Sequence, residues 1–94
     1  MNDAGTASRT VTICNERGLH ARAAARFVKL AGLFAAEVSV RKNGTEVSGR
    51  SIMGLMMLAA GPGCALELRA AGPDAAAALD ALAALVANRF DEEK

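Results

Sequence analysis

The chain has 94 residues, with 11 basic and 10 acidic side chains and a formal net charge of +1. This length allows one domain, and because 22 residues are alanine, few large side chains remain to build its core. With three Phe, two Cys and no Trp or Tyr, the chain is a poor stacking platform for nucleic-acid bases and cannot form a disulfide framework.

The sequence also argues against a membrane protein, a secreted protein and a metal-binding protein. No apolar run approaches the roughly 18 residues that a membrane span needs, and the first nine residues lack the apolar centre of a signal peptide. We therefore expect a cytoplasmic location without membrane insertion. One His and two Cys are too few for an ordinary structural zinc site, so no metal and no cofactor is expected.

The N-terminal half of the chain predicts a strand, a turn and a helix. Residues 1–9 have the composition of a tail, whereas Thr10–Cys14 alternates polar and apolar residues as a half-buried strand does. A turn follows at residues 15–18. From Ala21 the apolar residues recur with helical spacing, and Gly32 is a natural end for that helix.

The remainder predicts three strands and two helices. Asn43-Gly44 favours a two-residue hairpin turn, since both positions of a type I′ turn need positive φ. Ser51 and Asp74 are favourable N-caps for the helices that follow them. The expected strands are 36–41, 45–48 and 64–70, and the expected helices are 52–59 and 75–89.

The element order β-α-β-β-α-β-α predicts an α+β open-faced sandwich. In this fold class a four-stranded antiparallel sheet carries three helices on one face. We expect a single domain over residues 10–90, between an N-terminal tail (1–9) and a C-terminal tail (91–94). Strand parity directs Cys14 away from the core and Cys64 into it, which predicts two free thiols.

The one histidine, His20, precedes the first predicted helix. The free backbone N–H groups and the positive dipole end of a helix favour an anion there, and Arg22 could bind phosphate oxygens. The same positive charges disfavour the imidazolium, so the ring is expected to be neutral, with a nucleophilic lone pair. A lone histidine at this position is more often a simple capping or surface residue.

A basic stripe and an apolar patch could serve partner binding. Positive charge is concentrated in the first half of the chain. Residues 1–50 hold 8 basic and 4 acidic side chains, whereas residues 51–94 hold 3 basic and 6 acidic side chains. The helix at residues 52–59 has more large apolar side chains than an inward face needs. The expected partner-binding residues are Arg17, Arg26, Lys29, Ile52, Met53 and Met56.

Two strings resemble those of a known family. Residues 18–23 read Gly-Leu-His-Ala-Arg-Ala, and residues 51–56 read Ser-Ile-Met-Gly-Leu-Met. The first resembles the active-site signature of the histidine-containing phosphocarrier family HPr of the bacterial phosphotransferase system, and the second resembles its regulatory-serine helix. The order of the predicted elements also matches that family, so the resemblance extends over about residues 9–90.

The resemblance implies specific roles and partners. His20 would carry a phosphoryl group on Nδ1, Arg22 would assist it, and Ser51 would be phosphorylated by an ATP-dependent HPr kinase. Enzyme I would be the donor and an Enzyme IIA the acceptor, so the chain would be a monomeric carrier rather than an enzyme. One departure is Ala23, because the family usually has Pro at this position. Unlike Pro, Ala23 has a backbone N–H that can donate a hydrogen bond.

Alternative functions remain at this point. The chain could belong to the nitrogen-related regulatory branch, which residues 15–20 and the ending 90–93 resemble, instead of the sugar-transport branch. A small basic nucleic-acid-binding module would have a similar β-α-β-β-α-β core, but its aromatic residues should lie on strands. We expect no nucleic-acid partner. For Ser51, a purely structural N-cap role competes with regulation.

Overall fold

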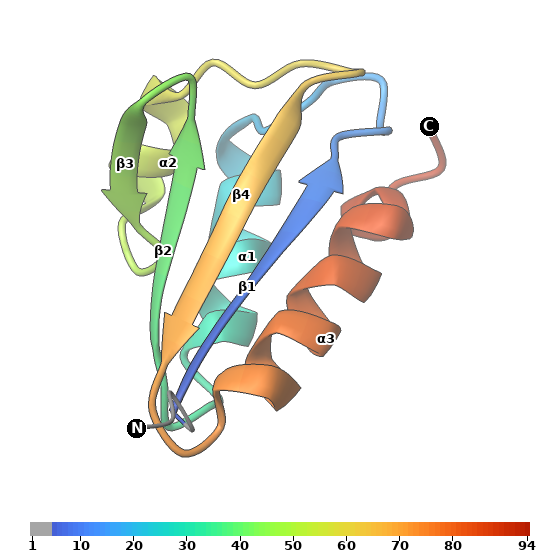
Figure 1. The fold of residues 1–94 in the computed structure, drawn as a ribbon. Coiled ribbons are helices and arrows are strands. Elements are labelled where there is room, and N and C mark those ends of the chain that lie inside the picture. Colours follow the sequence, from blue (N-terminus) through green and yellow to red (C-terminus); the bar gives the residue numbers. More distant parts are fainter. Residues whose placement is uncertain (1–4) are drawn as a thin grey trace.

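A computed structural model describes residues 5–94, which form one four-stranded antiparallel sheet and three α-helices (Figure 1). The helices lie on one face of the sheet, as the α+β open-faced sandwich predicts. The elements are β1 (Thr6–Thr12), α1 (Ala21–Ala31), β2 (Glu37–Lys42), β3 (Thr45–Ser48), α2 (Ile52–Met57), β4 (Ala65–Ala71) and α3 (Ala75–Ala87), followed by a short 3-10 turn, η1 (Arg89–Asp91).

The sheet order is β1-β4-β2-β3, so the first and last strands of the chain are neighbours. β1 pairs with β4 from Thr6 opposite Ala71 to Thr12 opposite Ala65. The β2–β3 hairpin closes at Asn43-Gly44, whose φ angles of +49° and +85° are those that the two-residue turn requires.

The core lies between the sheet and the helices, and alternation along the strands supplies its sheet side. Val11 and Ile13 point inward from β1 and its extension, and Leu66 and Leu68 do so from β4. The helices contribute mainly alanine, which allows them to approach the sheet closely. Phe27 and Phe90 are fully buried and Phe34 packs against the same core. All three rings therefore contribute to the core, and none lies on a strand of the sheet.

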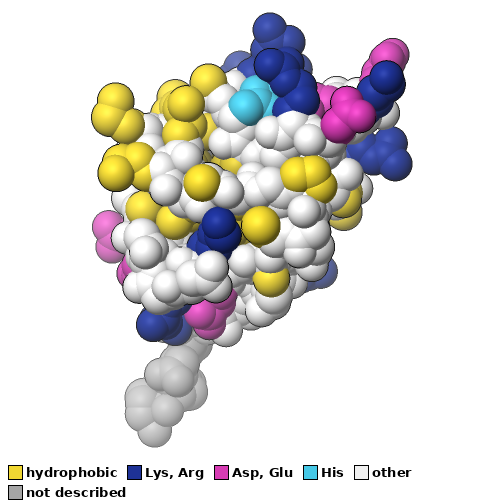
Figure 2. Space-filling model, turned by 90° about the horizontal axis from the view of Figure 1, so that it is seen from above, with side chains coloured by type: hydrophobic (Ala, Val, Ile, Leu, Met, Phe, Trp, Pro, Cys, Tyr) yellow, Lys and Arg dark blue, Asp and Glu magenta, His cyan; other side chains and the backbone are white. Residues whose placement is uncertain are grey.

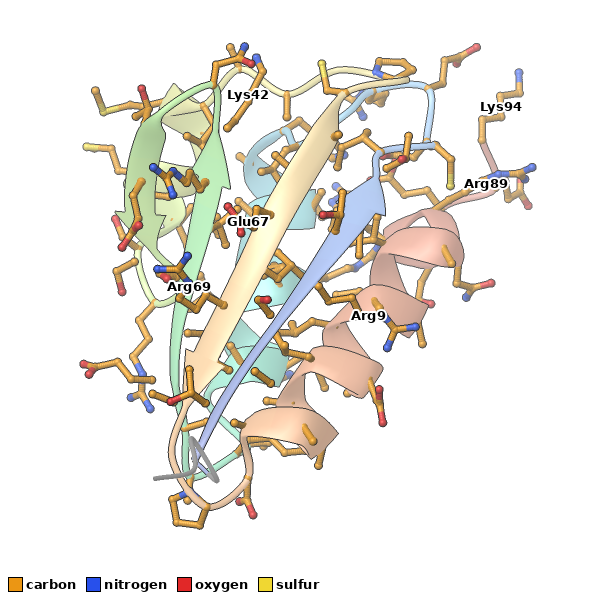
Figure 3. All side chains as sticks on the ribbon, in the orientation of Figure 1. Arg9, Lys42, Glu67, Arg69, Arg89 and Lys94 are labelled. Carbon is orange, nitrogen blue, oxygen red and sulfur yellow. The ribbon has the colours of Figure 1, made fainter. Side chains whose placement is uncertain are left out.

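Polar contacts attach the outer elements to the sheet (Figure 3). Nη1 of Arg9 on β1 lies 2.7 Å from Oδ1 of Asp80 on α3. Nζ of Lys42, at the end of β2, donates to the carbonyl oxygen of Leu58 at 2.9 Å and so holds the hairpin against the end of α2. No helix among residues 5–94 combines the length and apolar character needed to cross a membrane.

Both predicted tails differ from the structure. Residues 6–9 belong to β1, because they pair with β4 even though their side chains show little hydrophobic alternation; residues 1–4 lie outside the described part. Residues 91–94 do not project from the domain. The backbone N–H of Glu16 donates to the carbonyl oxygen of Lys94, so the C-terminal end packs against the turn before α1.

Two smaller predictions concern Asp74 and the cysteines. Asp74 is the N-cap residue of α3, but its side chain makes no capping bond and its Oδ2 accepts from the backbone N–H of Ala35 at 2.8 Å. This bond ties α3 to the turn after α1. Cys14 is exposed and Cys64 is half-buried against the core, and both are free thiols, as predicted.

Gly18 should tolerate no side chain. Its φ is +67°, and a Cβ there would lie 2.5 Å from the carbonyl oxygen of Ala60. Gly18→Ala is expected to lower the free energy of unfolding by about 3 kcal/mol, because a left-handed backbone and a backbone clash both oppose it. Gly44→Ala is the control, since φ is +85° but no atom lies within 4 Å; it should cost about 1 kcal/mol. Equal losses in urea unfolding would contradict this account.

Candidate functional site

The site is the end of the molecule where α1 begins. His20 is the N-cap of α1, in extended conformation (φ −78°, ψ −179°), and its side chain makes no capping bond to the helix. The ring is therefore not used to satisfy the first helical N–H groups. Figure 2 shows the histidine on the surface of this end, with basic side chains beside it and hydrophobic side chains on the side of α2.

The turn before α1 positions this N-cap. Its close approach to the loop after α2 is possible because Gly18 has no side chain, and the N–H of Leu19 donates to the carbonyl oxygen of Ala60 at 2.9 Å. Asn15, which is fully buried, closes the turn from the other side by donating from Nδ2 to the carbonyl oxygen of Gly18 at 2.8 Å. His20 thus begins α1 at a fixed position.

Sequence reasoning missed an acidic partner of the histidine. Nε2 of His20 pairs with Oε2 of Glu92, and the two side chains are only 19% and 16% exposed. Oε1 of Glu92 accepts from Nδ2 of Asn15 at 3.0 Å. The predicted site contained only positive groups near the ring. The carboxylate offsets part of that positive charge, so the sequence-based argument for a neutral ring omitted an opposing contribution.

Glu92 is held at the histidine by an unusual backbone. Arg89, Phe90 and Asp91 are consecutive non-glycine residues with φ of +58°, +53° and +64°. Each left-handed residue costs roughly 1–2 kcal/mol, and complete burial of the Phe90 ring opposes that cost. Nη1 of Arg26 also donates to the carbonyl oxygen of Phe90. The segment therefore turns back towards α1 instead of extending α3.

The environment of Glu92 lowers the pKa of its carboxyl group. Burial alone would raise the pKa, but hydrogen bonds from Asn15 and His20 and the nearby charges of His20 and Arg26 outweigh burial. The carboxylate form is therefore the one present beside the ring at neutral pH.

The predicted basic residues divide into two groups. Arg17, Arg22 and Arg26 line one hollow of about 330 Å³ together with Glu16, the acidic residues 91–93 and Lys94. Arg22 is exposed. Arg26, which the sequence predicts to bind a partner, is half-buried, and its Nη1 donates to the carbonyl oxygen of Phe90. Lys29 lies in the last turn of α1, outside the lining of that hollow.

The predicted residues on α2 are arranged as expected for a surface patch. Ile52, Met53 and Met56 are exposed, and Met57, which sequence reasoning omitted, is 77% exposed. Leu55 faces the core. We call the four exposed residues, Ile52, Met53, Met56 and Met57, the apolar patch; they line one hollow of about 460 Å³.

Ser51 is the N-cap of α2. Its Oγ accepts from the backbone N–H of Gly54 at 2.9 Å, so the structural role weighed for this residue is present. Ala23 is fully buried and forms part of the core under the first turn of α1. The methyl group therefore faces the core at the position where the resemblance expects Pro.

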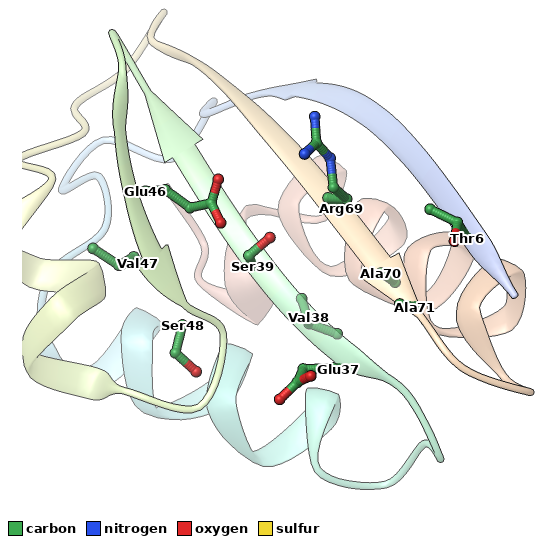
Figure 4. Close-up of a pocket in the computed structure, with 10 residues that line it drawn as sticks. All are labelled: Thr6, Glu37, Val38, Ser39, Glu46, Val47, Ser48, Arg69, Ala70 and Ala71. Atoms are coloured by element: carbon green, nitrogen blue, oxygen red, sulfur yellow. The ribbon is translucent and has the colours of Figure 1, made fainter. Parts of the chain in front are cut away.

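A separate hollow of about 430 Å³ lies on the open face of the sheet (Figure 4). Its lining includes Glu37, Glu46 and Arg69, but neither histidine nor cysteine. Among the described residues, no group of three or more His, Cys, Asp or Glu side chains is placed to hold a metal ion. The start of α1 is thus the place where a nucleophilic ring and anion-binding groups coincide.

Comparisons with known proteins agree on this fold and identify its family. Residues 7–88 match the family model described as the PTS HPr component phosphorylation site. The chain is 54% identical over 84 residues to the phosphocarrier protein HPr of Cupriavidus necator, covering 89% of this chain and 94% of that protein. It is 49% identical over 84 residues to the phosphocarrier protein NPr of Shewanella violacea, with 89% and 92% covered.

A solved structure has the same fold. The crystal structure of an HPr from Thermoanaerobacter tengcongensis superposes with a TM-score of 0.88 at 40% identity, covering 94% of this chain and 99% of that one. The family match and the fold define the class: phosphocarrier proteins of the phosphotransferase system. The chain belongs to the HPr family, and its relatives include proteins named HPr and one named NPr.

Glu92 should make stability depend on pH in the acid range. Since its pKa is lower in the folded chain than the ordinary value of 4.5, the folded chain binds fewer protons and stability falls as the pH drops below that value. Glu92→Gln is expected to be less stable than the parent at pH 7, with the difference shrinking below pH 4.5. Urea unfolding at several pH values measures this; Glu93→Gln is the control. A pH-independent difference would contradict the prediction.

Proposed function

We propose that His20 accepts a phosphoryl group from Enzyme I on Nδ1 and passes it to an Enzyme IIA. The observation that carries this proposal is the position of the chain's one histidine, at the N-cap of α1 on an exposed end of an HPr-family fold. The ring can reach a partner without a substrate pocket. A carrier of this kind contributes the nucleophile, and its partners contribute the remaining catalytic groups.

Arg22 and the first turn of α1 are proposed to bind the phosphoryl oxygens. Arg22 is exposed, and its backbone lies in the first helical turn, where N–H groups have no partner within the helix. The guanidinium can donate two parallel hydrogen bonds to an anionic group. Both features favour the phosphorylated form of the ring over the free form, which supports transfer onto the histidine.

The apolar patch is proposed as the docking surface for both partners. It lies on the same end of the molecule as the histidine (Figure 2), and Met side chains adapt to partners of different shape. Arg17, in the turn before α1, would attract acidic partner surfaces at the edge of this contact, and Lys29, in the last turn of α1, would add to the attraction at longer range. Because the patch must be accessible to partners, we also propose that the chain acts as a monomer in the cytoplasm.

Ser51 is proposed as a regulatory site for an HPr kinase. Its hydroxyl lies at the start of α2, next to Ile52 of the apolar patch. A phosphate there would add about two negative charges to a surface that partners must cover. The N-cap bond to Gly54 and this regulatory role use the same oxygen, so phosphorylation would act at the cap itself.

The regulatory, nitrogen-related branch is the second candidate function. It is favoured by the 49% identity to the NPr of Shewanella violacea. The identity of the acceptor separates the two branches, since the site chemistry at His20 is the same in both.

Incubation with phosphoenolpyruvate and Enzyme I should label the chain with one acid-labile, base-stable phosphoryl group. His20→Ala is expected to remain unlabelled, because the chain contains no other imidazole. Ser51→Ala is the control and should be labelled as the parent is. Intact mass spectrometry measures the products. Labelling of His20→Ala would place the acceptor on another residue.

Met53→Ser should weaken partner docking without unfolding the domain. Met53 is 74% exposed, so its loss removes contact area from a complex and little from the core. The KM of Enzyme I for this chain as its substrate is expected to rise about tenfold, as it does when a typical interface anchor is removed. Leu33→Ser is the matched control: Leu33 is also 74% exposed but follows α1 at the end of the helix opposite His20. Equal effects of both changes would exclude the apolar patch as the docking surface.

A further inference from the structure

We propose that Glu92 is a positioning residue that keeps the proton of His20 on Nε2 and thereby presents Nδ1 as the phosphoryl acceptor. The inference rests on the proposed function, because it names how the histidine of that carrier is prepared for reaction. It assigns a task to the last residues of the chain, which follow α3 and reach the histidine across 72 positions of sequence.

The first step of the argument is the bond itself. Nε2 of His20 and Oε2 of Glu92 are paired, and the lowered pKa of the carboxyl group means that it holds no proton near pH 7. A carboxylate can only accept a hydrogen bond, so the proton must lie on Nε2. In a neutral ring the other nitrogen, Nδ1, then has a free lone pair.

The second step is that the carboxylate is held in place. Its other oxygen accepts from Nδ2 of Asn15, and Asn15, the first residue of the turn before α1, is fully buried. The buried ring of Phe90 and the bond from Arg26 to the Phe90 carbonyl oxygen hold the backbone two residues away. Both carboxylate oxygens are therefore engaged, which differs from a mobile surface ion pair.

The third step is the balance of the reaction. The Nδ1 lone pair forms a bond to phosphorus on a phosphorylated donor protein, while the donor's own bond to phosphorus breaks and its electron pair stays on the donor. Nε2 keeps its hydrogen throughout. The ring therefore becomes a positive imidazolium that carries a dianionic phosphoryl group, and Glu92 faces that new positive charge. Transfer to an acceptor reverses these changes.

The charges around the ring are thus complementary to the product. The first turn of α1, with Arg22 and its free N–H groups, directly follows His20, and Glu92 lies at Nε2 of the ring. The ring gains positive charge during the transfer. The carboxylate therefore stabilises the transition state more than it stabilises the unphosphorylated ring. Loss of Glu92 should therefore slow acceptance of the phosphoryl group.

The position of the proton can be measured directly in the parent protein by ¹H–¹⁵N NMR of the imidazole. In the neutral ring we expect the proton on Nε2, exchanging slowly with water, and an unprotonated Nδ1. Glu92→Ala should lose the slowly exchanging signal, whereas Glu93→Ala, the neighbouring acidic residue, should retain it. A proton on Nδ1 in the parent, or an unchanged Nε2 signal in Glu92→Ala, would overturn the proposal.

Phosphoryl transfer provides the second measurement and separates the two proposals. With Enzyme I and phosphoenolpyruvate, Glu92→Ala is expected to be labelled about tenfold more slowly than the parent, as for loss of a hydrogen bond to a charged group. Glu93→Ala should match the parent. A parent that accepts no phosphoryl group would refute the proposed function. A parent labelled on Nδ1, with Glu92→Ala labelled equally fast, would refute only the role of Glu92.

Discussion

The position of His20 depends on the close approach of the turn at Gly18 to the backbone of Ala60. The missing side chain at Gly18 lets the two segments meet, and the bond from Leu19 to the Ala60 carbonyl oxygen joins them. α1 therefore begins at a fixed distance from the end of α2. The histidine at its N-cap and the apolar patch on α2 lie on one end of the molecule for this reason (Figure 2).

The same end collects charges of both signs from distant parts of the sequence. Three arginines come from the turn before α1 and from α1, and three acidic residues follow α3; Glu16 and Lys94 are the exceptions to this division. The sheet order makes this possible, because α3 packs beside β1 and its end reaches the strand that leads to the histidine (Figure 1). Positive and negative side chains are thus both present near the His20 ring, although the net charge of the whole chain is small.

Much of the fold could be predicted because its signals are local. Alternation along 36–41 and 64–70, the Asn43-Gly44 turn and the start of α1 at Ala21 agree with the structure to within one residue. The beginning of β1 could not be predicted: residues 6–9 are small or polar and extend because β4 pairs with them. The N-cap role of Asp74 failed in detail, since the carboxylate binds Ala35 of another turn instead of its own helix.

The sequence by itself determined the element order, the place of His20 before a helix and the excess of apolar side chains on α2, since turn chemistry and periodicity are properties of neighbouring residues. Only the tertiary structure decided that Glu92 meets the imidazole and that Arg26 binds the C-terminal backbone. These contacts join residues that are far apart along the chain. They require a left-handed turn of three non-glycine residues, which burial of Phe90 stabilises and which no local preference favours.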